Sequence, residues 1–342
     1  MGDGWRTRVQ RGAGAPHRDV PSDGLAGARR GVASAVCGLA ALGLLAATAP
    51  PAPGGAQGPP AVAAREYRAP SVSAKDGAPL TIALTEKYRA DLDPTAQAAS
   101  GRIVLLAHGL SVSGLATFDV QVPGVPPAGS WSVMDQLALR GYDVWTLAVQ
   151  GYRQSDRHDC GLCVTTEAAA ADVEAAVRFV LAARRAGRLH LLGYSWGGQT
   201  AGLVAARHPE LVNRLVLAAP VLDRGPGDPP TAEFSPNTPD LAGYFHPTAA
   251  VPAVVAAFVA AAVAAEPVFP SGGAVDILTD PRKTDPRRLT APTLVIYGAD
   301  DALTPVGGSP GPRSRAGAAS TRRFTHSGWR SATRPAAWPP HE

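Results

Sequence analysis

The sequence has few charged residues, which make up 18% of its 342 positions, and this low share argues against a coiled coil. It also has only three cysteines, and no second Cys-x-x-Cys pair that could complete a four-ligand zinc site. Hydrophobic residues are abundant, at 45%, which is too many for a disordered chain and enough for a sizeable core. High counts of glycine (37) and proline (33) predict that parts of the chain form loops or tails.

The sequence also lacks a basic surface pattern, although its net charge is +4. The positive excess lies at the ends, because residues 1–30 carry +3, residues 306–342 carry +5 and the residues between them carry −4. A mildly acidic body without a basic stripe predicts no nucleic-acid partner.

Residues 1–56 have the order of an export signal followed by a Pro/Gly-rich leader. Arg29 and Arg30 precede an uncharged Ala/Leu/Gly run at 31–49, and small residues follow. We predict cleavage after Ala56 and export to the periplasm or the medium, with the paired arginines compatible with a twin-arginine route. Cleavage would leave no stable membrane span. The alternatives are an uncleaved membrane anchor at 31–49 or a buried core helix.

Cys160 and Cys163 form a Cys-x-x-Cys pair in a loop before a predicted helix. In an oxidising compartment a local disulfide is the ordinary outcome for such a pair, so both residues are disulfide candidates. A thioredoxin-type redox site would need the pair to follow a strand and open a helix, and zinc would need two further ligands. Free thiols and a redox or metal role are the alternatives.

Between residues 65 and 305, apolar strands alternate with helical stretches. Two strands flank the turn signal Asp76-Gly77, at 67–74 and 79–88. The further predicted strands are 102–107, 142–149, 188–192, 214–219 and 293–297, and the helices are 131–140, 165–185 and 196–207. This alternation predicts an α/β fold with a mostly parallel sheet and helices on both faces.

The alternation lapses over residues 222–290, which contain an Ala/Val-rich helix at 249–265. We predict a helical lid or cap insertion here, and the alternative is a surface excursion at the edge of the sheet. The predicted α/β domain spans residues 65–342, and its last part, 306–342, is an atypical tail with few aliphatic residues and no helical periodicity.

The motif that indicates the chemistry is G-x-S-x-G at residues 193–197, with Ser195 at its centre. It lies between a predicted strand and a predicted helix, which is the context that this motif requires. The sharp turn strains the backbone of the nucleophile and exposes its Oγ, while the following helix directs N–H groups at the site. Ser195 is therefore the predicted nucleophile.

From residue 65 to residue 305 the chain resembles the α/β-hydrolase superfamily. The sequence His108-Gly109-Leu110, after the strand at 102–107, resembles the loop that supplies an oxyanion donor in that superfamily. The resemblance implies an oxyanion hole made of the Leu110 and Trp196 N–H groups. The alternative is that His108-Gly109-Leu110 is a plain glycine turn.

The segment after the strand at 293–297 resembles the superfamily's acid loop, in which the acid stands three residues after a glycine. That position is Asp301, and Asp300 is the alternative. The superfamily order Ser, acid, His requires a base beyond Asp301, where only His326 and His341 stand. We choose His326, because it follows a short predicted strand at 322–325 and His341 stands next to the end of the sequence.

The tail departs from the superfamily pattern, which has a helix, a strand, a Gly-His turn and a closing helix. Residues 306–342 contain little that could form either helix. Either the tail is divergent and functional, or the end of the gene is altered and His326 is incidental. In the second case the serine would lack its base, and activity would fall by orders of magnitude.

The resemblance implies a serine hydrolase that cleaves a carboxylic ester or similar small acyl substrate through a Ser195–His326–Asp301 triad and an acyl-enzyme. The leader predicts that this hydrolase is exported. No metal or organic cofactor is implied. Serine at the elbow disfavours the dehalogenases and epoxide hydrolases of this fold, which carry aspartate there. The alternatives are amide, thioester or carbon–carbon bond hydrolysis or perhydrolysis on the same triad, and an inactive binding protein on a hydrolase scaffold. The sequence makes no prediction about oligomeric state.

Overall fold

The computed structural model of the chain divides into two units, residues 1–55 and 56–342. The residues it describes are 60–152, 154–221, 226–245, 250–298, 301, 319–325 and 328–332. The predicted leader therefore lies outside the described residues, and the fold below is that of the second unit.

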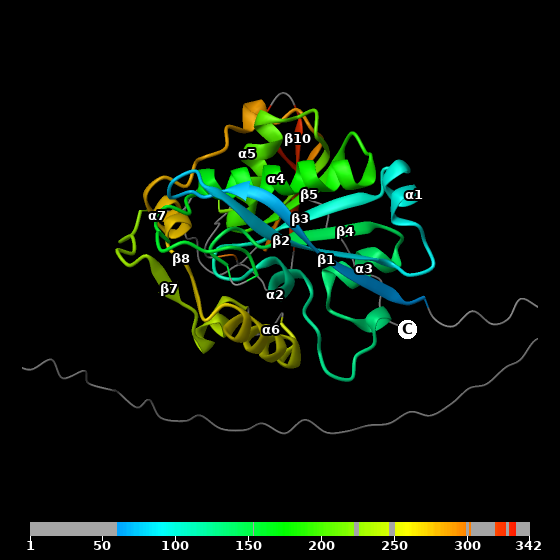
Figure 1. Cartoon of the computed structure of the whole chain (residues 1–342), viewed down its shortest axis with the longest axis horizontal. Coiled ribbons are helices and arrows are strands. Elements are labelled where there is room, and N and C mark those ends of the chain that lie inside the picture. The colour runs from blue at the N-terminus through cyan, green and yellow to red at the C-terminus, as the bar shows by residue number, and fades with distance from the viewer. Residues whose placement is uncertain are drawn as a thin grey trace, which may run out of the picture. The chain divides into compact units, whose positions relative to one another are not determined.

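Within the described residues, nine strands form one sheet in the order β1-β2-β4-β3-β5-β6-β9-β10-β11 (Figure 1). The strands of this sheet are β1 (Val62–Val72), β2 (Pro79–Arg89), β3 (Ile103–Ala107), β4 (Asp143–Leu147), β5 (Leu189–Tyr194), β6 (Val212–Ala218), β9 (Thr293–Gly298), β10 (Ala319–Thr325) and β11 (Gly328–Ala332). The central strands β4, β3, β5, β6 and β9 are parallel to one another. Antiparallel pairs flank them, β1 and β2 on one side and β10 and β11 on the other.

Helices cover both faces of the sheet, as the sequence predicts. The helices are α1 (Pro94–Ala99), α2 (Gly114–Phe118), α3 (Val133–Leu139), α4 (Thr166–Arg184), α5 (Trp196–Arg207), α6 (Pro252–Ala265) and α7 (Gly272–Thr279). None of the helices within the described segments is long and apolar enough to cross a membrane.

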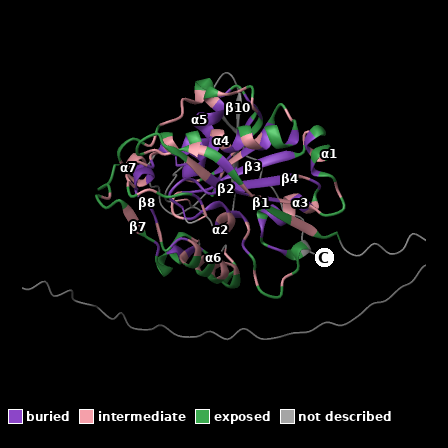
Figure 2. Cartoon of the chain, viewed as in Figure 1, coloured by how far each residue is buried: buried purple, intermediate pink, exposed green. Residues whose placement is uncertain are grey.

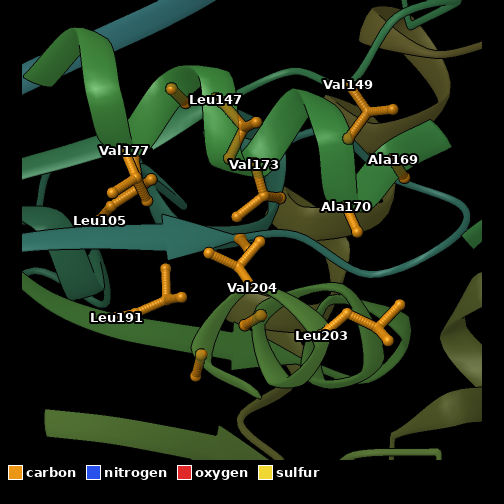
Figure 3. Close-up of a cluster of buried hydrophobic side chains, with 14 of the residues drawn as sticks. Leu105, Leu147, Val149, Ala169, Ala170, Val173, Val177, Leu191, Leu203 and Val204 are labelled. Carbon is orange, nitrogen blue, oxygen red and sulfur yellow. The ribbon is translucent and has the colours of Figure 1, made fainter. Parts of the chain in front are cut away.

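Alternating side chains of the central strands explain this layering. Leu105 and Leu147 pack with α4 and α5 in the larger core, whereas Leu106 and Val144 pack with Met134 of α3 in a smaller one. Figure 3 shows side chains of α4 lying over Leu105 and Leu147. Every residue of β3 and β4 is buried, and both strands are purple in Figure 2. Strands that are buried along their whole length are stable here, because a helix layer covers each face of the sheet.

The β1–β2 hairpin is confirmed, with Val72 paired to Pro79 across the predicted turn. Its turn contains Gly77 at φ 74°, a conformation that glycine adopts without strain. The strands and helices predicted between residues 102 and 219 are present within a few residues of their expected bounds. Helix α1 was not expected, because six residues show too little periodicity.

The segment predicted as a lid, residues 222–290, contains more than one helix. It includes α6, as predicted, but also α7 and a small antiparallel sheet of β7 (Phe234–Pro236) and β8 (Val268–Pro270). Helix α6 packs on α2 through an apolar cluster that includes Val112, Ala116 and Ala262. Its function as a lid stays a prediction.

The described part of the tail forms strands. The strand predicted at 322–325 is the second half of β10, which pairs antiparallel with β9, Ala319 opposite Gly298. Strand β11 was not predicted, and neither was the antiparallel direction of β10. The sequence could not show this direction, because residues 306–342 lack the helical crossover pattern by which a parallel strand is recognised.

A buried ion-pair network joins α4 to the antiparallel side of the sheet. The Arg184 guanidinium donates to Asp143 Oδ2 at 2.8 Å and to Glu86, and all three side chains are buried. The Tyr67 hydroxyl donates to Glu86 Oε2 at 2.7 Å. Burial raises the pKa of the Asp143 carboxyl to about 7, against the nearby positive charge of Arg184, which lowers it. Removing Arg184 would leave two buried carboxyl groups without their positive partner, and this typically costs about 3–5 kcal/mol.

A second buried carboxyl, Asp172 in α4, holds the chain after β4. Its Oδ2 accepts from the Gln150 backbone N–H at 2.8 Å, and its Oδ1 accepts from the Ser71 hydroxyl at 2.5 Å. Burial nevertheless raises its pKa to about 6, from an ordinary 3.8. The folded protein therefore holds a proton between pH 4 and pH 6 that the unfolded chain has released.

We predict that the free energy of unfolding decreases as pH rises from 4 to 6.5. A native pKa above the unfolded value stabilises the fold at low pH, and the loss for Asp172 is about 2–3 kcal/mol over this window. Urea unfolding across this range measures it, with Asp172→Asn as the comparison, since asparagine has a similar shape and does not titrate. A wild-type slope equal to that of Asp172→Asn would show that this carboxyl is not responsible.

Candidate active site

Ser195 forms the turn between β5 and α5. Its backbone has φ 55° and ψ −120°, a conformation that side chains larger than glycine rarely adopt. Its N–H donates to Ala218 O at 2.9 Å, and its carbonyl accepts from the Gly198 N–H at 2.9 Å. The strained turn is thus held from both sides, and the half-buried side chain stands at the carboxyl edge of the parallel strands. This is the geometry of a nucleophile elbow.

Two glycines make the elbow possible, because other backbone atoms pass close to them. A Cβ on Gly193 would lie 2.1 Å from the Gly197 carbonyl oxygen. A Cβ on Gly197 would lie 2.2 Å from the carbonyl oxygen of Ala107, the last residue of β3. No side chain fits at either position, so the motif's glycines let α5 start directly against the end of β3.

The loop after β3 lies beside the serine. A Cβ on Gly109 would stand 3.3 Å from Ser195 Cβ. Within the described residues, neither the Leu110 N–H nor the Trp196 N–H donates a hydrogen bond to another group. Both predicted oxyanion donors are therefore available next to the elbow, since the first N–H groups of a helix have no partner inside it.

His108 holds the loop after β3 from inside the protein. Its Nε2 accepts from the Val149 N–H at 3.1 Å, so Nδ1 carries the proton and donates to the Gly109 carbonyl at 2.7 Å. Burial lowers the pKa of His108 to about 4, and the ring is therefore neutral at pH 7. The Tyr152 hydroxyl donates to the Leu110 carbonyl oxygen and fixes the loop a second time.

Trp196 is anchored through its side chain. Its indole N–H donates to Thr166 Oγ1 at 2.9 Å, and the ring is 1% exposed. Thr166 starts α4, and its N–H donates to Asp276 Oδ2 of α7 at 2.7 Å. Sequence reasoning missed this role of Thr166 and the role of Tyr152, because both contacts join segments far apart in the chain and leave no local pattern.

Asp301 follows β9 at the same edge of the sheet. Its N–H donates to the Gly298 carbonyl oxygen at 3.2 Å, and the residue is half-buried. The pKa of Tyr194, next to the nucleophile position, is raised first by desolvation and second by the negative charge of Asp301. The structure therefore brings Asp301 near the elbow. The alternative acid, Asp300, lies outside the described residues.

Neither candidate base, His326 nor His341, is among the described residues. The strands around the first of them are described. Strand β10 runs antiparallel to β9, so it leads from Ala319, beside Gly298, towards the opposite edge of the sheet. Thr325, which pairs with Gly328, therefore lies at the edge away from Ser195.

Cys160 and Cys163 are joined in a disulfide, three positions apart, in the loop before α4. Among the residues that the structure describes, no group of three or more His, Cys, Asp or Glu side chains is arranged to hold a metal ion.

We predict that Gly193→Ala destabilises the fold strongly. The new Cβ would overlap the Gly197 carbonyl, and overpacking a rigid core typically costs about 1–3 kcal/mol or more. Gly187→Ala is the matched control, because a Cβ there meets nothing within 4 Å. The free energy of unfolding in urea should fall for the first variant and change by less than about 1 kcal/mol for the second. Equal stabilities would contradict the close approach.

The family described as alpha/beta hydrolase fold matches residues 102–248 of the chain. No curated protein matches it. A hydrolase from Pseudomonas aeruginosa PA01 is 23% identical with a TM-score of 0.48, covering 70% of this chain and 83% of that one. A thermophilic esterase from Thermogutta terrifontis is 18% identical with a TM-score of 0.47, covering 70% and 82%.

An epoxide hydrolase from Vigna radiata is 17% identical, with a TM-score of 0.32 and coverage of 50% of this chain. The chain spans 43% of that enzyme, less than half of its length. The segment that matches the family, residues 102–248, contains both the loop after β3 and the elbow at Ser195. Over residues 102–248 the chain is therefore similar to the alpha/beta hydrolase fold family.

Proposed function

We propose that the chain is a serine hydrolase that cleaves a carboxylic ester or a similar acyl compound through an acyl-enzyme. The observation that carries this proposal is the backbone of Ser195, held at φ 55° in a strand-to-helix turn. It lies beside two N–H groups that donate to no other group among the described residues. Such strain is retained where the surrounding structure over-determines it, and it is typical of catalytic positions. The apolar cluster of α2 and α6, next to the loop after β3, supports an apolar substrate side.

In the proposed reaction, Ser195 Oγ attacks the acyl carbonyl carbon while its proton passes to the His326 imidazole. The Leu110 and Trp196 N–H groups stabilise the negative oxygen, which typically contributes a few kcal/mol per donor. The intermediate collapses, and the alcohol leaves with the proton from the imidazolium. Water then repeats the sequence on the acyl-enzyme and releases the acid. Asp301 orients His326 and stabilises its charged form.

Whether His326 reaches Ser195 distinguishes this function from a second candidate function. Strand β10 leads away from the edge of the sheet that holds Ser195, and His326, the residue that follows it in the sequence, lies outside the described residues. This register favours the second candidate function, a hydrolase-fold protein that binds acyl compounds without turning them over. The same elbow would then serve as a binding site.

A fluorophosphonate probe separates the two functions. An activated serine is expected to be labelled within minutes, whereas Ser195→Ala should not be labelled at all. His326→Ala and Asp301→Asn should slow labelling by orders of magnitude if the triad operates. His341→Ala tests the alternative base in the same assay.

Absence of labelling in folded wild-type protein would support the binding function. Unchanged labelling in His326→Ala would assign the base to another residue. If the protein is labelled and turns over amides or thioesters but not short-chain esters, the proposed substrate class is wrong and the proposed triad still holds.

We also propose export of the protein after cleavage of residues 1–56. The disulfide between Cys160 and Cys163 supports it, because such bonds persist in oxidising compartments. Expression of the full chain in a bacterial host should yield a mature protein that begins near Gln57 in the periplasm or the medium, as N-terminal sequencing would show. A mature chain that keeps residues 31–49 and sediments with membranes would favour the anchor.

A further inference from the structure

The start of α7 touches both residues of the proposed oxyanion hole. A Cβ on Gly273 would lie 2.6 Å from Cε2 and Cζ2 of Trp196 and 2.8 Å from Cδ1 of Leu110. These distances are below those of real Cβ contacts, so the backbone at Gly273 is pressed against both side chains. Glycine is the only residue that fits between α7 and this pair.

Gly272, the residue before Gly273, packs against the disulfide loop, which we define as Cys160–Cys163. A Cβ on Gly272 would lie 2.5 Å from the Leu162 carbonyl oxygen. The Gly272 N–H donates to the Gly161 carbonyl oxygen at 3.1 Å. Two consecutive glycines therefore contact the disulfide loop on one side and the oxyanion residues on the other.

Glu233 clamps the disulfide loop to the same segment. Its Oε2 accepts from the Leu162 N–H at 2.8 Å, and its carbonyl accepts from the Ser271 N–H at 3.0 Å. A Cβ on Gly161 would lie 1.8 Å from the Glu233 carbonyl oxygen. The disulfide loop, Glu233 and the start of α7 are thus in direct backbone contact.

We propose that the disulfide loop positions the oxyanion hole through Gly272 and Gly273. The cross-link holds four residues in one closed turn and so limits the conformations of Gly161 and Leu162. Those two residues seat the start of α7, and Gly273 in turn holds Trp196 and Leu110 against the elbow. These are positioning residues, and none of them contacts the reacting atoms. The catalytic consequence rests on the proposed function, whereas the structural coupling does not.

Hydrogen exchange measured by mass spectrometry tests the coupling without requiring activity. The variants are Gly273→Ala, which forces the contact apart, and the double variant Cys160→Ser/Cys163→Ser, which removes the cross-link. Gly243→Ala is the matched control, because a Cβ at Gly243 meets nothing within 4 Å. Both test variants should exchange about tenfold faster at the peptides containing Leu110 and Trp196, with unchanged exchange in β3 and β4. The control should match the wild type.

Labelling kinetics give the catalytic consequence. The maximal rate of fluorophosphonate labelling should fall about 10- to 100-fold in both test variants, as expected for donors displaced by about 1 Å, while the concentration for half-maximal rate stays constant. Unchanged exchange at the Leu110 and Trp196 peptides in either folded variant would overturn the coupling. Faster exchange without labelling of the wild type would uphold the coupling and reject the proposed hydrolase function instead.

Discussion

The close approach of three backbone segments at the elbow is the constraint on which the rest of the site depends. Gly193 and Gly197 each leave no room for a Cβ, because carbonyl oxygens lie within 2.2 Å of where that atom would stand. This contact draws the start of α5 against the end of β3 and forces Ser195 to a positive φ. The serine and the loop after β3 therefore become neighbours for a steric reason, before any chemistry is considered.

Buried polar contacts around the elbow hold the two predicted oxyanion donors. Neutral His108 links the ends of β3 and β4, and Tyr152 holds the Leu110 carbonyl. Thr166 holds the Trp196 indole at the first turn of α4. Each contact joins two different segments, and buried bonds of this kind rigidify a site because leaving any partner unpaired is costly. The site is therefore assembled by the surrounding fold and depends little on the loops' own conformational preferences.

The antiparallel β10 has the largest consequence for function. In the parallel part of the sheet, every strand delivers its following residue to the edge that holds Ser195 and Asp301. Strand β10 runs the other way, so its last residue, Thr325, lies at the opposite edge. Binding of a carbonyl group needs only the elbow and the donors, whereas turnover also needs a proton acceptor. The direction of β10 therefore bears on the choice between the two proposed functions.

The sequence by itself determined the α/β fold, the strands from 102 to 219 and the elbow at Ser195, because apolar runs, turn residues and glycine spacing are local properties. The sequence also predicted Asp301 as the acid, from its place after a strand. It predicted the disulfide between Cys160 and Cys163 from their spacing in a loop. Only the tertiary structure decided the direction of β10 and the contact of Gly273 with the oxyanion residues. Both depend on which distant segments pack together. Contacts between distant segments, unlike the periodicity of a helix or strand, produce no regular pattern in the sequence.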